Sequence, residues 1–553
     1  MKLARQVRAR LRWYPRRSDW PAVSYTAGGL SRDREPALGE YSAVTLLNLN
    51  RRRAGHRPPV MSPPPIPFDV PPYRLSGSVY GTLLNHRSAL AALGDAVNHA
   101  PYQAPPRAPV LYIKPRNTLA RRFDAVVVPA DVSEMEVGAT LGLVIGRTAC
   151  RVSPAHALEC VAGYTIVNDV SVPHDSVYRP SLRFKLRDGS CPIGPGVVRR
   201  DAIANPDALT IRTWVDGELV SQSSTADLVR PVAGLLADVT EFMTLSAGDV
   251  LMVGVAAGAP RVRAGQLVVI EIDGLGRLEN RFVAERPEAG APAAPPSFAP
   301  PATGPRARVA HFGAIHDATP HERGLQLADG RVLAEDAVVW LPPFDVGTVI
   351  ALGLNYADHA RELAFSAQQE PLAFLKGPGT LIGHRGQTRR PADVKFMHYE
   401  CELAVVIGRP ARKVRRADAM AHVAGYTVAN DYAIRDYLEN YYRPNLRVKN
   451  RDGCTALGPW FVDAASAGEP QFALRTWVNG KLTQQGHTRD LVFDIPTLIE
   501  YLSSFMTLLP GDVILTGTPE GVVDVRPGDE VVTEIDGIGR LVNTIVADDR
   551  FGR

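Results

Sequence analysis

Short runs of apolar and β-branched residues recur along most of the chain. Clear examples lie at residues 403–408, 473–482 and 529–535, and Gly, Asp-Gly or Asn-Gly turns bound them. Such runs predict strands joined by tight turns. Short helices are expected at 417–425 and 495–506, because apolar residues in the second of these segments recur every three to four positions. The pattern predicts an α+β fold in which strands predominate.

Several other fold and cofactor classes do not fit this pattern. Strands and helices do not alternate regularly, which argues against a doubly wound parallel sheet. The sequence has no GxGxxG or P-loop motif, so a nucleotide cofactor is not expected. It also has no run of about 18 uncharged apolar residues, so no membrane-spanning helix is expected.

The chain resembles itself. GYTIVND, which begins at Gly163, recurs as GYTVAND at Gly425, and RTWVDG at Arg212 recurs as RTWVNG at Arg475. Two further pairs, YRPSLRFKLRDG with YRPNLRVKNRDG and EIDGLGRLEN with EIDGIGRLVN, keep nearly the same spacing. A constant spacing over several blocks indicates that one ancestral unit was duplicated.

The repeat, together with composition, predicts the domain organisation. A stretch rich in Pro and Ala separates the two copies and is typical of a semi-rigid linker. The expected divisions are a basic leader (1–60), a first, degenerate repeat (61–285), the linker (286–305), a leading segment of the second repeat (306–345) and the second repeat itself (346–553).

The positive charge of the chain is concentrated in the leader. Residues 1–60 hold 13 basic and 4 acidic residues, whereas the whole chain has a formal charge of only +4. The body is therefore slightly acidic, and we do not interpret the charge as a nucleic-acid footprint. The leader lacks the apolar stretch of a secretory signal. We expect it to be disordered or to precede a true start at Met61, with a targeting arm as the alternative.

Cysteine usage indicates a reducing compartment. The five cysteines form no CxxC pair, so neither a disulfide framework nor a thiolate zinc site is expected. The cytoplasm is the predicted location.

Comparison of the two copies separates residues kept for the fold from residues kept for chemistry. In HYECELAVVIG, Glu400 and Glu402 are two apart in a predicted strand, so both carboxylates face the same side. The first copy has Gly138 and Thr140 there. Adjacent carboxylates repel each other unless a cation lies between them. With Asp431 as a third oxygen donor, they predict a site for a hard divalent cation, although an exposed pair of glutamates or a turn role for Asp431 is the alternative.

A second constellation predicts proton transfer. In GLNYADHARELAF, His359 and Glu362 are three residues apart at the start of an expected helix, and the first copy has Arg87 and Leu90 in their places. A carboxylate beside an imidazole orients it and raises its basicity, as a general base near neutral pH requires. A surface ion pair is the alternative interpretation.

Four further residues are candidates for substrate contacts or catalysis. Thr518, in the TGTPEG loop, and Arg435 are specific to the second copy, where the first has Val255 and Pro173. Lys449 and Lys376 are present in both copies, as Lys185 and Lys114, so a purely structural role for these lysines stays open.

With these motifs in place, both copies resemble the fumarylacetoacetate hydrolase family over about 200 residues each. The resemblance implies two tandem family domains of mixed β-sandwich or β-roll architecture that form an internal pseudo-dimer. It implies that Glu400, Glu402 and Asp431 bind the metal, and that His359, Glu362 and Lys449 are catalytic. It assigns substrate binding to Arg435 and Thr518, and we add Lys376.

The resemblance also implies a reaction. We expect a metal-dependent decarboxylase and isomerase of 4-hydroxyphenylacetate (homoprotocatechuate) catabolism, with Mg2+ as the expected metal and Mn2+ or Ca2+ as alternatives. It would convert 5-oxopent-3-ene-1,2,5-tricarboxylate to 2-hydroxyhepta-2,4-dienedioate and then to 2-oxohept-3-enedioate. The first copy would serve as a built-in partner or hold a second, metal-free activity.

Other functions remain open at this stage. They are an acylpyruvate C–C hydrolase, an oxaloacetate-type decarboxylase without isomerase activity, and a non-catalytic protein that binds a metal or a dicarboxylate. The expected partner is a small oxo-dicarboxylate or oxo-tricarboxylate, with no nucleic acid and no membrane. The assembly is expected to be a monomer with its internal pseudo-dimer, or a homo-oligomer of it.

Overall fold

The computed structural model describes residues 78–100, 102–175, 181–286, 304–357, 370–439 and 446–548. The leader and the linker core lie outside these residues. Residues 61–553 form one compact unit, to which all contacts below belong. The division into domains at the positions expected from sequence stays a prediction.

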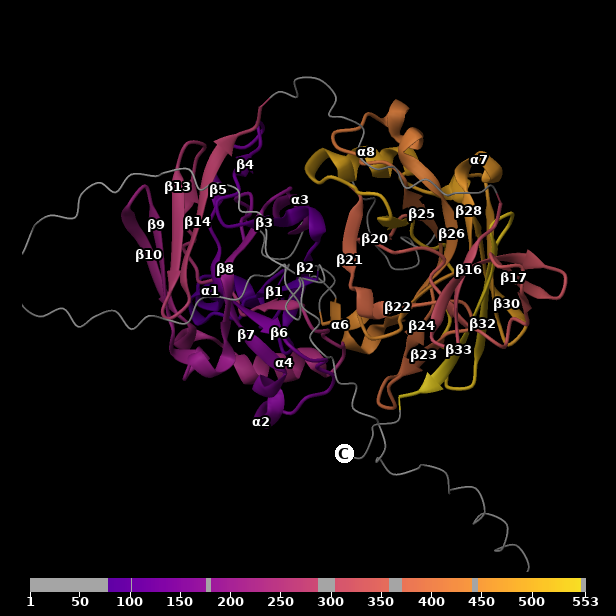
Figure 1. Ribbon diagram of the computed structural model, residues 1–553, viewed down its shortest axis with the longest axis horizontal. Coiled ribbons are helices and arrows are strands. Elements are labelled where there is room, and N and C mark those ends of the chain that lie inside the picture. The colour runs from indigo at the N-terminus through magenta and orange to yellow at the C-terminus, as the bar shows by residue number, and fades with distance from the viewer. Residues whose placement is uncertain are drawn as a thin grey trace, which may run out of the picture. The chain divides into compact units, whose positions relative to one another are not determined.

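The first repeat is built on a sheet of seven strands and a sheet of five, with one two-stranded ribbon. The larger sheet has the order β2 (Val110–Lys114), β1 (Val79–Leu83), β11 (Val250–Met252), β6 (Ala139–Ile145), β7 (Val161–Asn168), β8 (Cys191–Arg199), β3 (Leu119–Arg121). The smaller has the order β10 (Glu218–Ser224), β9 (Thr210–Val215), β13 (Leu267–Ile272), β14 (Gly276–Ala284), β4 (Val126–Val128), and the ribbon joins β12 (Arg261–Val262) to β5 (Met135–Glu136). Figure 1 shows β9, β10, β13 and β14 side by side.

The second repeat has the same strand order in its two main sheets. Its larger sheet runs β21 (Leu372–Lys376), β20 (Val349–Gly353), β31 (Val513–Leu515), β25 (Cys401–Ile407), β26 (Val423–Asp431), β28 (Thr455–Asp463), β22 (Leu381–Ile382). Its smaller sheet runs β23 (Gln387–Arg390), β33 (Gly539–Ala547), β32 (Glu530–Ile535), β29 (Ala473–Val478), β30 (Lys481–His487), and β24 (Met397–His398) pairs with β27 (Ala433–Ile434). The duplication seen in the sequence is therefore a duplication of topology.

Helices are short and fewer than strands, as the sequence predicted. The α-helices are α1 (Arg87–Ala91), α2 (Pro154–Ala157), α3 (Ser181–Lys185), α4 (Val232–Thr240), α6 (Leu446–Lys449), α7 (Ala464–Ala467) and α8 (Ile495–Phe505). The 3-10 helices are η1 (Gly94–Asn98), η2 (Arg116–Thr118), η3 (Leu158–Cys160), η4 (Arg200–Ala202), η5 (Pro206–Ala208), η6 (Thr225–Asp227), η7 (Pro378–Thr380), η8 (Arg416–His422), η9 (Arg435–Tyr437) and η10 (Thr488–Asp490).

The two helices expected from sequence have different outcomes. The prediction of a helix at 495–506 is confirmed as α8, whose first turn is capped by the Asp494 side chain accepting from the Thr497 N–H. The short helix expected at 417–425 is confirmed as far as His422 and wrong beyond it. Its residues form the 3-10 helix η8, and Val423 already begins β26, because pairing with β25 and β28 extends that strand.

The segment expected to lead into the second repeat forms a sheet of its own. Five strands lie in the order β18 (Val332–Leu333), β17 (Gly324–Leu327), β16 (Ala314–His321), β15 (Ala307–His311), β19 (Val339–Leu341). Trp340 of β19 packs edge-on against Trp460 of β28, with ring centroids 5.5 Å apart. The buried apolar residues of this sheet therefore pack against β28 of the second repeat through Trp460.

His384 lies at this junction and gives the fold an acid-sensitive element. Its Nδ1 accepts from the Val542 N–H at 3.1 Å, and its ring lies edge-on to Trp340. Burial, with a smaller effect of Arg385, lowers the pKa of His384 to about 4. In the unfolded chain His384 takes up a proton near pH 6.5, whereas in the folded chain it does so only near pH 4. The free energy of unfolding therefore falls as the pH drops from about 6.5 toward 4.

We predict that replacing His384 with Asn, which keeps an acceptor but does not titrate, reduces this pH dependence. Between pH 7 and pH 5 the wild type should lose about 2 kcal/mol more unfolding free energy than His384→Asn. Urea unfolding at the two pH values measures the difference. Equal losses in both proteins would exclude His384 as the source.

Candidate metal centre

Strand pairing brings three carboxylates from two segments together. β25 and β26 are antiparallel, with Cys401 opposite Asn430, so Glu400 lies beside the last residue of β26. The Asp431 N–H donates to the Glu400 carbonyl at 2.9 Å. One ligand atom each from Glu400, Glu402 and Asp431 lies within 4.8 Å of the others, and all three residues are buried. The long apolar run after Glu402 explains the burial, because both faces of β25 are covered.

Glu402 has an oxygen available for a cation. Its Oε2 accepts from the Gly517 N–H at 2.6 Å, whereas its buried Oε1 has no hydrogen-bond partner among the described residues. Burial and the charges of Asp431 and Glu400 raise the pKa of Glu402 well above its ordinary range. An anionic oxygen in this position is costly unless a cation offsets it. The donors fit a hard divalent ion, since all three are carboxylates.

Two lysines border the carboxylates. The Lys449 ammonium lies 2.7 Å from Glu400 Oε2 and 2.8 Å from Asp431 Oδ2, and so bridges two of the three acidic residues. Burial alone would lower the pKa of Lys449, but Asp431 and Glu400 raise it above its ordinary value. Lys449 is therefore held as a cation within reach of the cluster.

Lys376 is placed differently from the substrate contact that the sequence suggested. Its ammonium donates to Asp431 Oδ1 and to the Lys449 carbonyl, and its side chain is fully buried. With these partners it supports Asp431 and the backbone of α6. We interpret Lys376 as a residue that braces the site, and a direct substrate contact stays an untested prediction.

Arg435 reaches the cluster with help from a residue that the sequence reasoning missed. Its Nε donates to His398 Nε2 at 2.8 Å, and its NH2 group is 3.5 Å from Glu400 Oε1. Burial, partly offset by Glu400, lowers the pKa of His398 to about 3, so the ring is neutral and accepts through Nε2. The first copy has Glu136 at this position. Comparison of the copies could therefore have identified His398.

Thr518 is also oriented by a residue that the sequence reasoning missed. The Gln484 side-chain amide donates to Thr518 Oγ1 at 2.9 Å and to the Pro519 carbonyl at 2.7 Å. Because Oγ1 already accepts one bond, the Thr518 proton is left to donate to an acceptor such as a carboxylate. The first copy has Ser221 and Val255 at these two positions, so both polar residues are specific to the second copy.

The proposed dyad is not part of this geometry. His359 and Glu362 lie outside the described residues. Their role as a proton-transferring pair stays a prediction from the sequence.

The corresponding place in the first repeat has one carboxylate where the second has three. A side chain on Gly138 would meet the Asp169 carbonyl, since its Cβ would lie 2.4 Å from that oxygen. Burial alone would raise the pKa of Asp169, but Lys185 and Lys114 lower it below its ordinary value. Their ammonium groups lie 2.7 and 3.1 Å from its oxygens. Among the described residues, the second-repeat cluster is the only group of three or more His, Cys, Asp and Glu side chains close enough together to share one metal ion.

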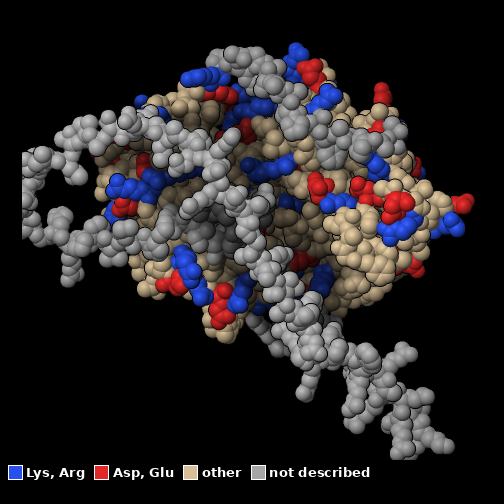
Figure 2. Space-filling model, in the orientation of Figure 1, with Lys and Arg blue, Asp and Glu red and all other residues tan. Residues whose placement is uncertain are grey.

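On the face shown in Figure 2, basic and acidic side chains of the described residues are interspersed. No helix in the described part of the chain is long and apolar enough to cross a membrane.

Comparison with known proteins gives consistent matches over both repeats. The family described as "Fumarylacetoacetate (FAA) hydrolase C-terminal" matches residues 78–283 and 348–546. A "4-hydroxyphenylacetate degradation bifunctional isomerase/decarboxylase" of Salmonella dublin is 46% identical over 86% of this chain and 99% of its own length. Its namesake in Escherichia coli is 45% identical with the same coverage. An Escherichia coli "Homoprotocatechuate catabolism bifunctional isomerase/decarboxylase" is 44% identical, again over 86% and 99%.

Proposed function

The chain belongs to the fumarylacetoacetate hydrolase family, and from this premise we propose that it is a divalent-metal-dependent decarboxylase and isomerase. The proposed pathway is the catabolism of 4-hydroxyphenylacetate. It is taken from the names of relatives that align with 86% of this chain over 99% of their own length. The observation that carries the proposal is the buried three-carboxylate cluster, in which Glu402 Oε1 has no hydrogen-bond partner among the described residues. Mg2+ is the metal we propose, on the hardness of the donors.

The proposed substrate is 5-oxopent-3-ene-1,2,5-tricarboxylate, a conjugated 2-oxo acid. A bound divalent cation would act as a Lewis acid for the 2-oxo acid group, where negative charge develops as the carbon–carbon bond to CO2 breaks. Lys449 and Arg435 supply positive charge next to the cluster. Thr518 has a proton to donate to a substrate carboxylate, and we place these three residues around the substrate on that basis.

The second reaction moves a proton. The electron pair left by CO2 gives a dienolate, which takes up a proton on its oxygen to form 2-hydroxyhepta-2,4-dienedioate. Ketonisation to 2-oxohept-3-enedioate requires that this hydroxyl proton leave and that a carbon at the far end of the diene be protonated. We propose that His359, oriented by Glu362, carries this proton. His359→Ala should then lose isomerisation while decarboxylation and metal content persist. Full isomerase activity in that variant would contradict the assignment.

The function is tested by following CO2 release and the dienol and enone absorbances on the tricarboxylate. We expect both reactions to require Mg2+ and to stop with excess chelator. Glu400→Ala should be inactive in both reactions at any Mg2+ concentration that leaves the wild type saturated. A reaction that survives both chelation and the substitution takes place elsewhere in the chain, and the proposal would fail for it.

The Gln484 amide gives a smaller and more specific prediction. Gln484→Ser installs the residue of the first copy and removes the two bonds that orient Thr518 and Pro519. It also removes the longer bonds that Gln484 Oε1 accepts from the Cys401 N–H at 3.4 Å and the Thr476 hydroxyl at 3.3 Å. We expect KM to rise about tenfold with kcat little changed, because one uniform substrate-binding interaction is lost. Gln485→Ser, at an exposed neighbour on the same strand, is the matched control. A loss of kcat without a change in KM would contradict a substrate-binding role for Thr518.

A further inference from the structure

The residue that bridges the carboxylates, Lys449, is carried on a very short helix. α6 has four residues, and an isolated single turn of helix is not stable in water. Within its own repeat, α6 and the turn after it are held from β21 and from that turn, and the Lys376 ammonium and the Gly377 N–H donate to the Lys449 carbonyl and to the Asn450 side chain. The Asn450 side-chain amide donates to the Leu375 carbonyl at 3.2 Å, and Cys454 Sγ donates to the Lys449 carbonyl at 2.9 Å. Any further contact that holds this turn therefore adds to the bonds that position Lys449.

The first repeat supplies that additional support. The Thr244 N–H donates to Asp452 Oδ1 at 2.8 Å, and the Thr244 hydroxyl donates to Asp452 Oδ2. Asp452 comes three residues after Lys449. A bidentate contact between a carboxylate and an N–H plus O–H pair fixes the direction of the carboxylate as well as its distance. Asp452 is therefore anchored from across the boundary between the repeats.

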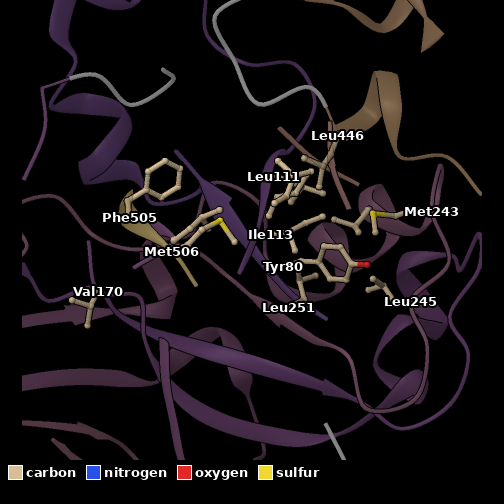
Figure 3. Packing of buried hydrophobic residues seen from close by; sticks show 14 of the residues in the cluster. Tyr80, Leu111, Ile113, Val170, Met243, Leu245, Leu251, Leu446, Phe505 and Met506 are labelled. Atoms are coloured by element: carbon tan, nitrogen blue, oxygen red, sulfur yellow. The ribbon is translucent and has the colours of Figure 1, made fainter. Parts of the chain in front are cut away.

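Apolar packing from the first repeat reaches the same short helix. Leu446, the first residue of α6, is buried in a core cluster shared by both repeats. Figure 3 shows Leu446 next to Leu111 and close to Ile113, both of which lie on β2 of the first repeat. The first repeat therefore contacts α6 at its beginning and, through Thr244, just after its end.

A charged residue of the first repeat adds to this contact. Glu241 lies 3.9 Å from Arg447 and 3.8 Å from Arg451, on either side of Lys449 in sequence. The second copy has Ser504 at the position of Glu241, so this contact exists on one side of the molecule only. Because Glu241 is nearly half exposed, we expect its share to be small compared with that of Thr244.

The interface also contains the equivalent contact with the roles of the two repeats exchanged. The Thr507 N–H donates to Asp188 Oδ1 at 2.9 Å, and its hydroxyl donates to Asp188 Oδ2 at 2.6 Å. Asp188 comes three residues after Lys185, the counterpart of Lys449 in the first repeat. The Thr–Asp bonds are the same in the two contacts, although Asp188 also accepts from the Asn117 amide at 2.8 Å and lies 3.2 Å from the Arg412 Nε. The two contacts differ in the lysine that lies three residues before the aspartate. In the second repeat this is Lys449, beside the three-carboxylate cluster, and in the first repeat it is Lys185, beside Asp169.

We propose that Thr244 is a positioning residue of the catalytic site: through Asp452 the degenerate first repeat fixes Lys449 against Glu400 and Asp431. This inference rests on the proposed function for its activity readout. The first repeat then contributes to catalysis without holding a metal. A misplacement of about 1 Å in a catalytic group costs up to about 100-fold in rate, so a contact of this kind is sufficient to matter.

The test compares Thr244→Val with Thr507→Val, which remove the same hydroxyl from the two halves of one interface. Both variants should show similar losses of thermal stability. Thr244→Val should lower kcat about tenfold with KM nearly unchanged, because Lys449 is misplaced in the transition state. Thr507→Val should keep kcat within about twofold of wild type. Thr244→Ser, which restores the hydroxyl, should recover most of the rate.

A second readout does not depend on turnover. If Lys449 moves away, Glu400 and Asp431 lose part of their neutralising charge, so Mn2+ used as the probe should bind severalfold more tightly to Thr244→Val and not to Thr507→Val. Isothermal titration measures this. Equal kcat and equal Mn2+ affinity in the two valine variants would overturn the inference, as would a serine variant as impaired as the valine variant. An inactive wild type would overturn the proposed function, and the Mn2+ comparison would still decide the role of Thr244.

Discussion

Replacing Glu402 with Gln is expected to abolish divalent-metal binding and to lower kcat/KM for decarboxylation by about 1000-fold, equivalent to about 4 kcal/mol of transition-state stabilisation. Glu402 is fully buried, and its Oε1 has no hydrogen-bond partner among the described residues. An amide at this position keeps the shape and can still accept from Gly517, but it carries no charge for the cation. The loss is therefore one of ligand charge and not of packing.

The same substitution should have the opposite effect on the metal-free protein. Because burial and its two acidic neighbours raise the pKa of Glu402 strongly, the charged form is a cost to the fold when no cation is bound. Without metal, Glu402→Gln should unfold at a higher temperature than the wild type. Adding Mg2+ or Mn2+ should then stabilise the wild type and leave the variant unchanged.

Calorimetric unfolding with and without metal, together with Mn2+ titration, measures both effects. Thr140→Val is the matched control, since Thr140 occupies the equivalent strand position in the first copy and its hydroxyl donates to backbone carbonyls, of Gly254 at 2.7 Å and of Leu141 at 3.5 Å. It should keep metal binding and activity. A Glu402→Gln protein that still binds Mn2+ with wild-type affinity would contradict the assignment of this carboxylate as a ligand.

The second large effect is expected at Lys449. Lys449→Met removes the ammonium between Glu400 and Asp431 and leaves two buried carboxylates facing each other. We expect kcat to fall by about 100- to 1000-fold, because positive charge aimed at the developing anion is lost. Loss of one partner of a buried ion pair should also cost about 3–5 kcal/mol of stability in the metal-free protein.

Lys185→Met is the matched control for this prediction. Lys185 makes the same kind of contact with Asp169 in the first repeat, at 2.7 Å, and is similarly buried. It should lower stability but leave both reactions close to the wild-type rate. Steady-state kinetics and urea unfolding of the two variants separate the effects. Equal losses of kcat in both would show that Lys449 acts through the fold alone, or that the first repeat has catalytic activity of its own.

Much of the site follows from local sequence. Glu400 and Glu402 share a face because strand side chains alternate, and the apolar residues after them predict that they are buried. Asp431 ends a block found in both copies, and the pairing of β25 with β26 brings it beside Glu400. These relations are short in sequence or set by one strand pair, which is why they could be predicted.

The contacts that orient the site could not be read in the same way. Gln484 and Thr518 come from different strands and loops, and Thr244 is 208 residues from Asp452 in sequence. Which polar groups meet across such distances depends on how whole sheets pack. The expected helix at 417–425 ends earlier than predicted for a related reason, since the pairing of β26 with its neighbours overrode a short local preference from Val423 onward.

The two repeats contact each other through reciprocal Thr–Asp bonds, as two subunits of a dimer would, but they belong to one chain. This affects how their sequences can diverge. In a symmetric homodimer every substitution appears twice, so a residue cannot be lost from one half and kept in the other. Here the halves are encoded separately in one chain, and Gly138 can replace a glutamate while Glu400 stays. Because the halves are covalently joined, their association does not weaken on dilution. One half was therefore free to diverge as long as it kept the residues that face its partner.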